Sequence, residues 1–156
     1  MDEIYVIEER PKLVVGMRRK GHYREIAEML PQLYKYAVSK GAIVSEHPMF
    51  IWHETSKADA QEADKSGNAD IEVCIPIAER IPETKTFKCY ELSGGKMAKM
   101  LHKGPYETCE STYDKLFAWI EKNRKMITGP IREAYLNDPK QVGINETLTE
   151  IYAPIN

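Results

Sequence analysis

Glu133 is the carboxylate with the most unusual sequence surroundings. It lies in the short apolar run 131–136, which predicts a β-strand, and alternate residues of a strand point to one face. Ile131, Glu133 and Tyr135 therefore share a face. A carboxylate among aromatic rings can anchor a cationic ligand, or act as a general base or nucleophile. The competing interpretation is that this face is exposed and Glu133 is only a solvated charge.

Aromatic side chains are the second signal, because the chain carries nine tyrosines and two tryptophans. Tyrosine combines an apolar ring with a polar hydroxyl, which suits a pocket for flat hydrophobic ligands. Tyr34, Tyr113 and Phe117 fall at helical spacing, where core packing is the commoner role. The aromatic residues on strands beside Glu133 are the better pocket candidates.

Three other kinds of site find no support in the residue pattern. The four histidines are scattered and no cysteine pair accompanies them, so no metal site is predicted. Cys109 falls in the apolar stripe of a predicted helix, which favours a buried, inert thiol. The glycines of residues 93–96 lack the spacing of a phosphate-binding loop and predict a hairpin turn. No cofactor is predicted.

The chain repeats itself. Lys-Gly-His-Tyr at residues 20–23 and Lys-Gly-Pro-Tyr at residues 103–106 each open a copy, 83 positions apart. At the closing strand the offset is 78, which matches Glu72 to Glu150. Two copies do not make a solenoid, so we predict a single pseudo-two-fold symmetric domain with a groove at the seam. It covers residues 1–156, with repeats at about 3–80 and 86–156.

The repeat strengthens the case that Glu133 is a functional residue. An offset of 83 aligns it with Phe50, and an offset of 82 aligns it with Ile51. In either register a charge stands where the other copy has a hydrophobic side chain. Such a charge is costly to bury unless something pairs with it, so Glu133 is a candidate ligand anchor.

Each copy predicts the order strand, helix, strand, strand, and an α+β fold with an antiparallel sheet and two main helices around a central cleft. Strands 4–7 and 13–17 are expected to be joined by a turn. The polar stretch 55–69 is expected to be an exposed loop between two paired strands. The other predicted elements are helices at 26–37 and 109–120 and strands at 49–54, 71–77, 87–92, 96–102, 131–136 and 148–155.

Composition limits the function classes. Lysine plus arginine (22) nearly balances aspartate plus glutamate (24), so neither direct nucleic-acid binding nor an anionic membrane surface is indicated. Three cysteines without paired spacing suit a reducing, cytoplasmic location and small core side chains. No segment approaches the length of an apolar membrane span.

The second copy carries a set of motifs that together resemble the GyrI-like effector-binding domain, over nearly the whole chain. They are His-Lys-Gly-Pro-Tyr at 102–106, Gly-Pro-x-x-Glu-x-Tyr-Leu at 129–136 and Thr-Glu-Ile-Tyr-x-Pro-Ile at 149–155. The resemblance implies a duplicated module around a hydrophobic cleft, as found in the drug-sensing domain of multidrug-responsive transcription regulators, in a gyrase inhibitor and in some hydrolases of cyclopropanoid xenobiotics. No DNA-binding segment precedes this domain, so we expect no direct binding of DNA and leave a separate regulator protein open as a partner.

By this resemblance Glu133 is the buried glutamate that anchors cationic lipophilic ligands, with Tyr106 and Tyr135 beside it and Trp52 and Phe50 as pocket wall. Tyr113 is kept as a further ligand-binding candidate. The leading hypothesis is a stand-alone protein that binds hydrophobic, often cationic, xenobiotics. The alternative is a hydrolase in which Glu133 and Tyr106 are catalytic. A gyrase inhibitor that acts through its surface is the third hypothesis.

Overall fold

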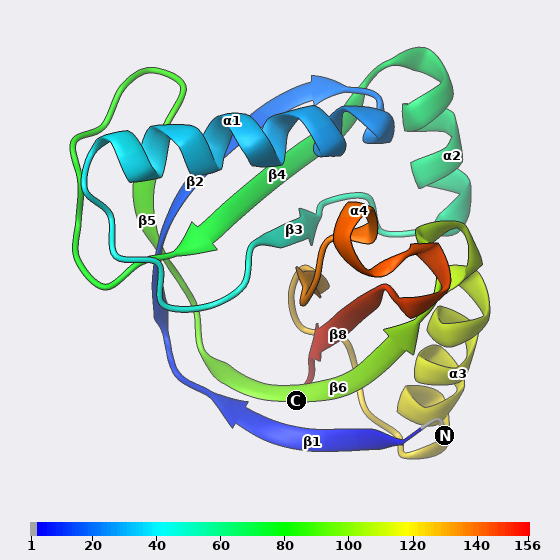
Figure 1. Ribbon diagram of the computed structural model, residues 1–156. Coiled ribbons are helices and arrows are strands. Elements are labelled where there is room, and N and C mark those ends of the chain that lie inside the picture. The colour runs from blue at the N-terminus through cyan, green and yellow to red at the C-terminus, as the bar shows by residue number, and fades with distance from the viewer. Residues whose placement is uncertain (1–2) are drawn as a thin grey trace. The chain divides into compact units, whose positions relative to one another are not determined.

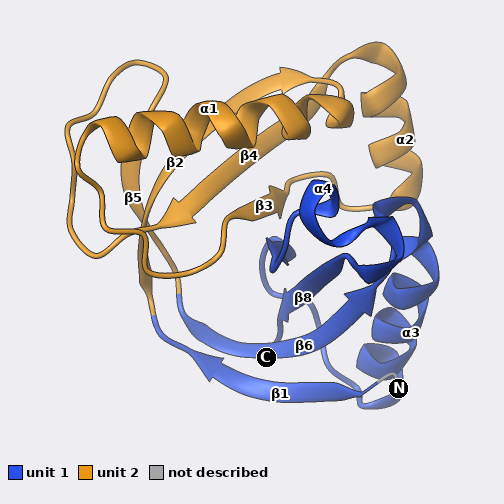
Figure 2. Ribbon diagram, in the orientation of Figure 1, with its two compact units in different colours: residues 1–10, 94–156 blue, residues 11–93 orange. Residues whose placement is uncertain are grey.

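A computed structural model describes residues 3–156, which form two compact units (Figure 2). Unit 1 comprises residues 1–10 and 94–156, and unit 2 comprises residues 11–93. Each unit contributes four antiparallel strands and one long helix. The α+β class, the duplication and the two main helices are therefore confirmed.

In unit 2 the strands run in the order β3, β4, β2, β5. They are β2 (Lys12–Gly21), β3 (Met49–Trp52), β4 (Ala69–Pro76) and β5 (Lys88–Leu92). Helix α1 (Ile26–Ser39) lies along β2 and β4 (Figure 1) and buries Met29, Leu33 and Ala37. Pro31 lies inside α1.

In unit 1 the order is β1, β6, β8, β7. The strands are β1 (Ile4–Glu9), β6 (Gly95–Lys103), β7 (Arg132–Tyr135) and β8 (Leu148–Pro154). Helix α3 (Cys109–Lys122) packs on β6, and its Leu116 and Ile120 join a core with Met100 and Ile151. The short helix α4 spans Pro139–Val142.

The strand registers fix the repeat offsets. Phe50 on β3 pairs with Val73 on β4, and Glu133 on β7 pairs with Ile151 on β8. The β3 and β7 positions are 83 residues apart and the β4 and β8 positions are 78 apart, so both predicted offsets are confirmed. Glu133 therefore corresponds to Phe50, and the alignment with Ile51 is wrong.

Three predictions about secondary structure are wrong. Residues 55–69 are not a loop, because Lys57–Ser66 form helix α2. Its N-cap Ser56 accepts a hydrogen bond from the Asp59 amide at 3.1 Å, and Gly67 ends it with φ 72°. None of its residues is buried, so it shows no apolar stripe in the sequence.

The second error concerns the first strand. The expected turn between β1 and β2 does not form, and the two strands do not pair: β1 pairs with β6, whereas β2 pairs with β4 and β5. The third error has the same cause, because β5 pairs with β2 and β6 with β1 and β8, so residues 93–96 are not a hairpin turn. β1 and β5 occupy equivalent positions in the two copies. Each copy has thus exchanged its first strand with the other.

All three cysteines are buried, as predicted. No helix within residues 3–156 is both long enough and apolar enough to cross a membrane.

Candidate functional site

Glu133 lies on the core side of the unit 1 sheet. It stands opposite Ile151, and directly paired residues of an antiparallel sheet point to the same face. Ile151 belongs to the core that packs against α3. Only 7% of Glu133 is exposed, so the interpretation of Glu133 as a solvated surface charge is not supported.

Two tyrosine hydroxyls hold the Glu133 carboxylate. Tyr113, on α3, donates a hydrogen bond to Oε2. Tyr135, two positions along β7, donates to Oε1 at 3.2 Å. Hydrogen bonds to an ionised group are the stronger kind, and they offset part of the cost of burying the charge.

The Tyr106 ring forms the outer part of this group, with 43% of the residue exposed. Its ring meets that of Tyr135 edge to face, with centroids 5.4 Å apart and an interplanar angle of 64°. Glu133, Tyr113, Tyr135 and Tyr106 therefore come together in unit 1. We call these four residues the Glu133 cluster.

A buried histidine fixes the backbone that carries Tyr106. His102 is 4% exposed, and its Nε2 lies 2.9 Å from the carbonyl oxygen of Pro105. Its Nδ1 lies 2.7 Å from the hydroxyl of Thr112 on α3. Because a carbonyl only accepts, Nε2 carries the proton and donates to Pro105. His102 and Thr112 were not predicted as site residues, although His102 opens the 102–106 motif, which was a usable signal.

The surroundings of Glu133 keep neighbouring groups protonated. Burial first, and then the charge of Glu133, raise the pKa of Tyr135 well above its usual value. Burial, with the charges of Asp138 and Glu133, also raises the pKa of Tyr106. Burial and the charges of Glu133 and Glu107 raise the pKa of Cys109 to about 12. The tyrosines are hydrogen-bond donors at neutral pH, and Cys109 is a neutral thiol.

One polar group beside the cluster has no partner. Thr149 is fully buried on β8, opposite Tyr135, and its Oγ1 makes no hydrogen bond within residues 3–156. Buried hydroxyls almost always find a partner, from protein or from water. The site therefore has polar capacity that the protein itself does not use.

Phe50 and Trp52 lie in unit 2 and pack with Tyr23. The Phe50 and Trp52 centroids are 4.8 Å apart, and Tyr23 lies 5.0 Å from Trp52. Phe50 is fully buried and belongs to the core of its unit. The Tyr23 hydroxyl donates to Glu54. Where unit 1 has the carboxylate of Glu133, unit 2 thus has a closed aromatic core.

Within residues 3–156 no three His, Cys, Asp or Glu side chains are arranged to hold a metal ion. The Glu133 cluster offers one carboxylate, three phenol groups and aromatic ring faces. This combination can bind a cation or a hydrogen-bond donor, and can exchange protons.

Comparisons with known proteins agree with this architecture. The model of the GyrI-like small molecule binding domain matches residues 2–156. No sequence among the curated proteins matches. The crystal structure of the EcmrR C-terminal domain is similar, with a TM-score of 0.87 and 18% identity, over 100% of this chain and 98% of that one. In the complex of EcmrR with DNA, the chain spans only 57% of the regulator.

Two further structures share the fold. A hydrolase from Listeria innocua has a TM-score of 0.69 and 15% identity, over 99% of this chain and 92% of that chain. SAV2435, whose structure was solved bound to tetraphenylphosphonium, has a TM-score of 0.59 and 12% identity, over 99% of this chain and 94% of that chain.

Proposed function

Because the chain belongs to the GyrI-like small-molecule-binding family, we propose that it binds hydrophobic, cationic small molecules through the Glu133 cluster. The observation that carries the proposal is a buried carboxylate, 7% exposed, that accepts hydrogen bonds from the hydroxyls of Tyr113 and Tyr135. Its negative charge and the aromatic faces around it both favour a cation.

Cation–π and charge–charge interactions both favour a cationic ligand at this cluster. A cation over an aromatic face gains about 0.5 to 2 kcal/mol, and more when water is excluded. A charge pair at a partly buried site adds to this, because the local dielectric is lower than that of water. Neither interaction demands one ligand shape, so the proposed protein accepts a range of cationic xenobiotics. The binding of tetraphenylphosphonium by SAV2435 supports the same choice of ligand class.

The experiment is a thermal-shift titration with tetraphenylphosphonium and with neutral triphenylphosphine oxide, which is of similar size. A ligand at 100 times its dissociation constant stabilises the fold by about 2.7 kcal/mol. For a domain of this length that is roughly 5–10 °C in Tm. We expect the cation to give the larger shift, and Glu133→Gln to remove its advantage. Glu121→Gln, an exposed carboxylate on α3, is the matched control and should leave the advantage intact. Equal shifts by both compounds in the native protein would refute the charge-based proposal.

A second candidate function is hydrolysis of an electrophilic small molecule at the same cluster. Protonated tyrosines on a buried carboxylate support it, and a hydrolase from Listeria innocua shares the fold. Glu133 would take a proton from water as the water oxygen bonds to the electrophilic carbon. The bond from that carbon to its leaving group breaks, and Tyr106 gives the leaving group its proton, which Glu133 then restores to Tyr106. Product release from a strained cyclopropane substrate, lost in both Glu133→Gln and Tyr106→Phe, would favour this reaction over binding alone.

A further inference from the structure

Unit 2 contains a second buried glutamate, on the opposite side of its sheet from the aromatic core. Glu72 is 7% exposed and lies between Ile71 and Val73 on β4. Successive strand residues point to opposite faces, so Glu72 faces away from Phe50, which pairs with Val73. Glu72 is distinct from the Glu133 cluster, and a role for it is independent of the proposed function.

Two side chains hold the Glu72 carboxylate. His53 Nε2 lies 2.6 Å from Oε1, and the Tyr90 hydroxyl donates to Oε2 at 2.5 Å. A carboxylate has about four acceptor positions, so these two contacts leave acceptor capacity on Glu72. Burial and the charge of Glu72 raise the pKa of Tyr90 far above its usual value, so Tyr90 stays a donor.

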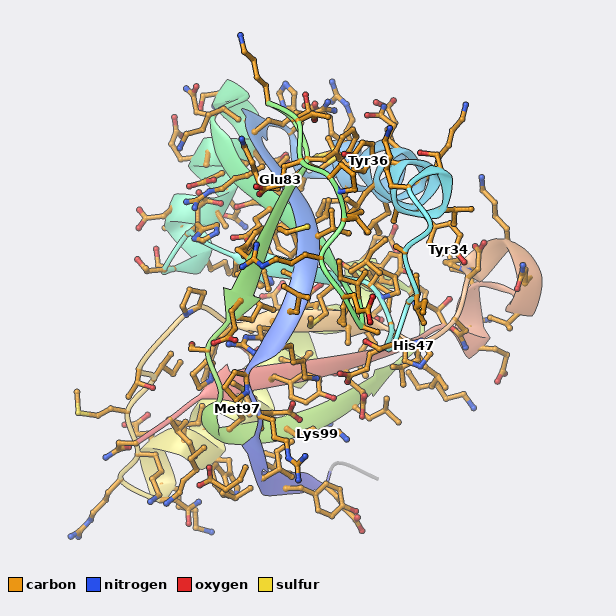
Figure 3. The ribbon with its side chains drawn as sticks, turned by 90° about the vertical axis from the view of Figure 1, so that its left-hand side faces the viewer. Tyr34, Tyr36, His47, Glu83, Met97 and Lys99 are labelled. Carbon is orange, nitrogen blue, oxygen red and sulfur yellow. The ribbon has the colours of Figure 1, made fainter. Side chains whose placement is uncertain are left out.

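In the other copy, the glutamate that corresponds to Glu72 is paired with a lysine. Glu150 is its counterpart on β8, and the ammonium of Lys99 lies 2.7 Å from Glu150. Lys99, labelled in Figure 3, corresponds to Gly16 on β2, as the pairing of Lys99 with Tyr152 and of Gly16 with Cys74 confirms. In unit 2 the space over Gly16 is taken by Tyr90, whose hydroxyl would lie 2.2 Å from a Cβ at Gly16. The contact that Glu72 receives from there is therefore a neutral hydroxyl, whereas Glu150 receives an ammonium.

A cavity of about 310 Å³ lies beside Glu72 and Tyr90. It is lined by Gly16, Glu72 and Tyr90 and, toward the solvent, by Arg18, Lys85 and Lys88. Arg18 is engaged by Asp70 through two hydrogen bonds of 2.7 Å. Within residues 3–156 neither Lys85 nor Lys88 has a carboxylate within 4.0 Å, so the mouth of the cavity carries two uncompensated positive charges.

The loop that carries Lys85 is held in place on both sides. Tyr36, on α1, stacks on Phe87 with centroids 4.2 Å apart. Glu83, on the loop itself, accepts a hydrogen bond from the Cys89 amide at 2.8 Å. Figure 3 labels Tyr36 beside this loop and Glu83 on it. The cavity wall is therefore built by packing and hydrogen bonds.

We propose that this cavity is a second binding site, for small organic anions that also carry a hydroxyl or amino group. The lysines at the mouth attract the anionic group, and Glu72 accepts a hydrogen bond from the donor group inside. A simple organic cation is disfavoured, because Arg18, Lys85 and Lys88 repel it before it reaches Glu72. Under the two proposals, the buried glutamates Glu72 and Glu133 select ligands of opposite charge.

The test uses 4-hydroxybenzoate, benzoate and phenol, with amide chemical shifts of 15N-labelled protein as the readout. We expect millimolar 4-hydroxybenzoate to shift the amides of Gly16, Arg18 and Tyr90, and benzoate and phenol to bind at least tenfold more weakly. The double change Lys85→Gln and Lys88→Gln should weaken 4-hydroxybenzoate at least tenfold. Both lysines are exposed, so this variant keeps the fold.

Two further variants complete the test. Glu72→Gln should abolish the preference for 4-hydroxybenzoate over benzoate. Lys35→Gln with Lys122→Gln removes the same charge from exposed helical positions and should leave binding unchanged. The proposal is overturned if those amides do not respond to 4-hydroxybenzoate, if benzoate and phenol bind as well, or if binding survives the loss of Lys85 and Lys88.

Discussion

Gly16→Ala should cost this protein an unusual amount of stability for the addition of one methyl group. A Cβ at Gly16 would lie 2.2 Å from the Tyr90 hydroxyl oxygen and 2.9 Å from two carbons of its ring. The ring must therefore move, and it takes its hydroxyl away from Glu72, 2.5 Å away. Overpacking costs about 1–3 kcal/mol, and loss of a hydrogen bond to a charged group about 1.5–3 kcal/mol. The free energy of unfolding should fall by roughly 2.5–6 kcal/mol, or roughly 5–24 °C in Tm.

The assay is urea denaturation of four proteins: native, Gly16→Ala, Tyr90→Ala and the double variant. In the Tyr90→Ala background the added methyl group has no ring to displace. There Gly16→Ala should be neutral, or stabilise by about 0.5–1 kcal/mol, because glycine weakens strands. If Gly16→Ala costs the same in both backgrounds, the contact with Tyr90 is not the cause and the reasoning is refuted. Unchanged m-values would show that the unfolded state is not responsible.

Three further outcomes are expected. Tyr113→Phe removes a hydrogen bond to Glu133 and should lower the free energy of unfolding by about 1.5–3 kcal/mol in the same urea experiment. Tyr34→Phe, at a residue 53% exposed, is the control and should cost under about 0.5 kcal/mol. Equal losses in the two variants would contradict this prediction. Because the folded pKa of Cys109 is raised to about 12, its thiol ionises first in the unfolded chain, so stability should fall as pH rises from 9 toward 12. The part of this loss of stability that is due to Cys109 should vanish in Cys109→Ala. If urea denaturation gives the same pH dependence of the unfolding free energy for both proteins across this range, Cys109 is not the cause. Ser56→Ala removes the N-cap of α2 and should cost about 0.5–2 kcal/mol, with faster amide exchange in Lys57–Ser66; unaltered exchange would show that the cap does not hold the helix.

The repeat led to the most reliable structural predictions, because two copies report on the same backbone. The offsets of 83 and 78 place Phe50 and Glu133 at equivalent positions, and the strand pairs show the same correspondence. Apolar spacing likewise predicted α1 and α3, since both helices bury a stripe against a sheet.

The errors have physical reasons. Helix α2 buries none of its residues, so its only sequence signals were Ser56, Gly67 and good helix-forming residues between them. The pairing of β1 with β6 depends on residues about ninety positions apart, whereas the predicted turn after β1 considered only neighbouring residues.

The two candidate sites also differ in how far the sequence could predict them. Glu133 and Tyr135 are two positions apart on one strand, so strand alternation was enough to bring them together. Glu72 was recognised only as a repeated strand residue. Its partners His53 and Tyr90 come from two other parts of the chain, and no local pattern connects them.

The exchanged first strands have a consequence for how the chain folds during synthesis. Unit 2 is continuous along the chain, so its sheet can be complete once β5 has left the ribosome. β1 is made first, yet its partner strand, β6, is made after all of unit 2. Until then β1 presents unpaired backbone groups that a second nascent chain can pair with.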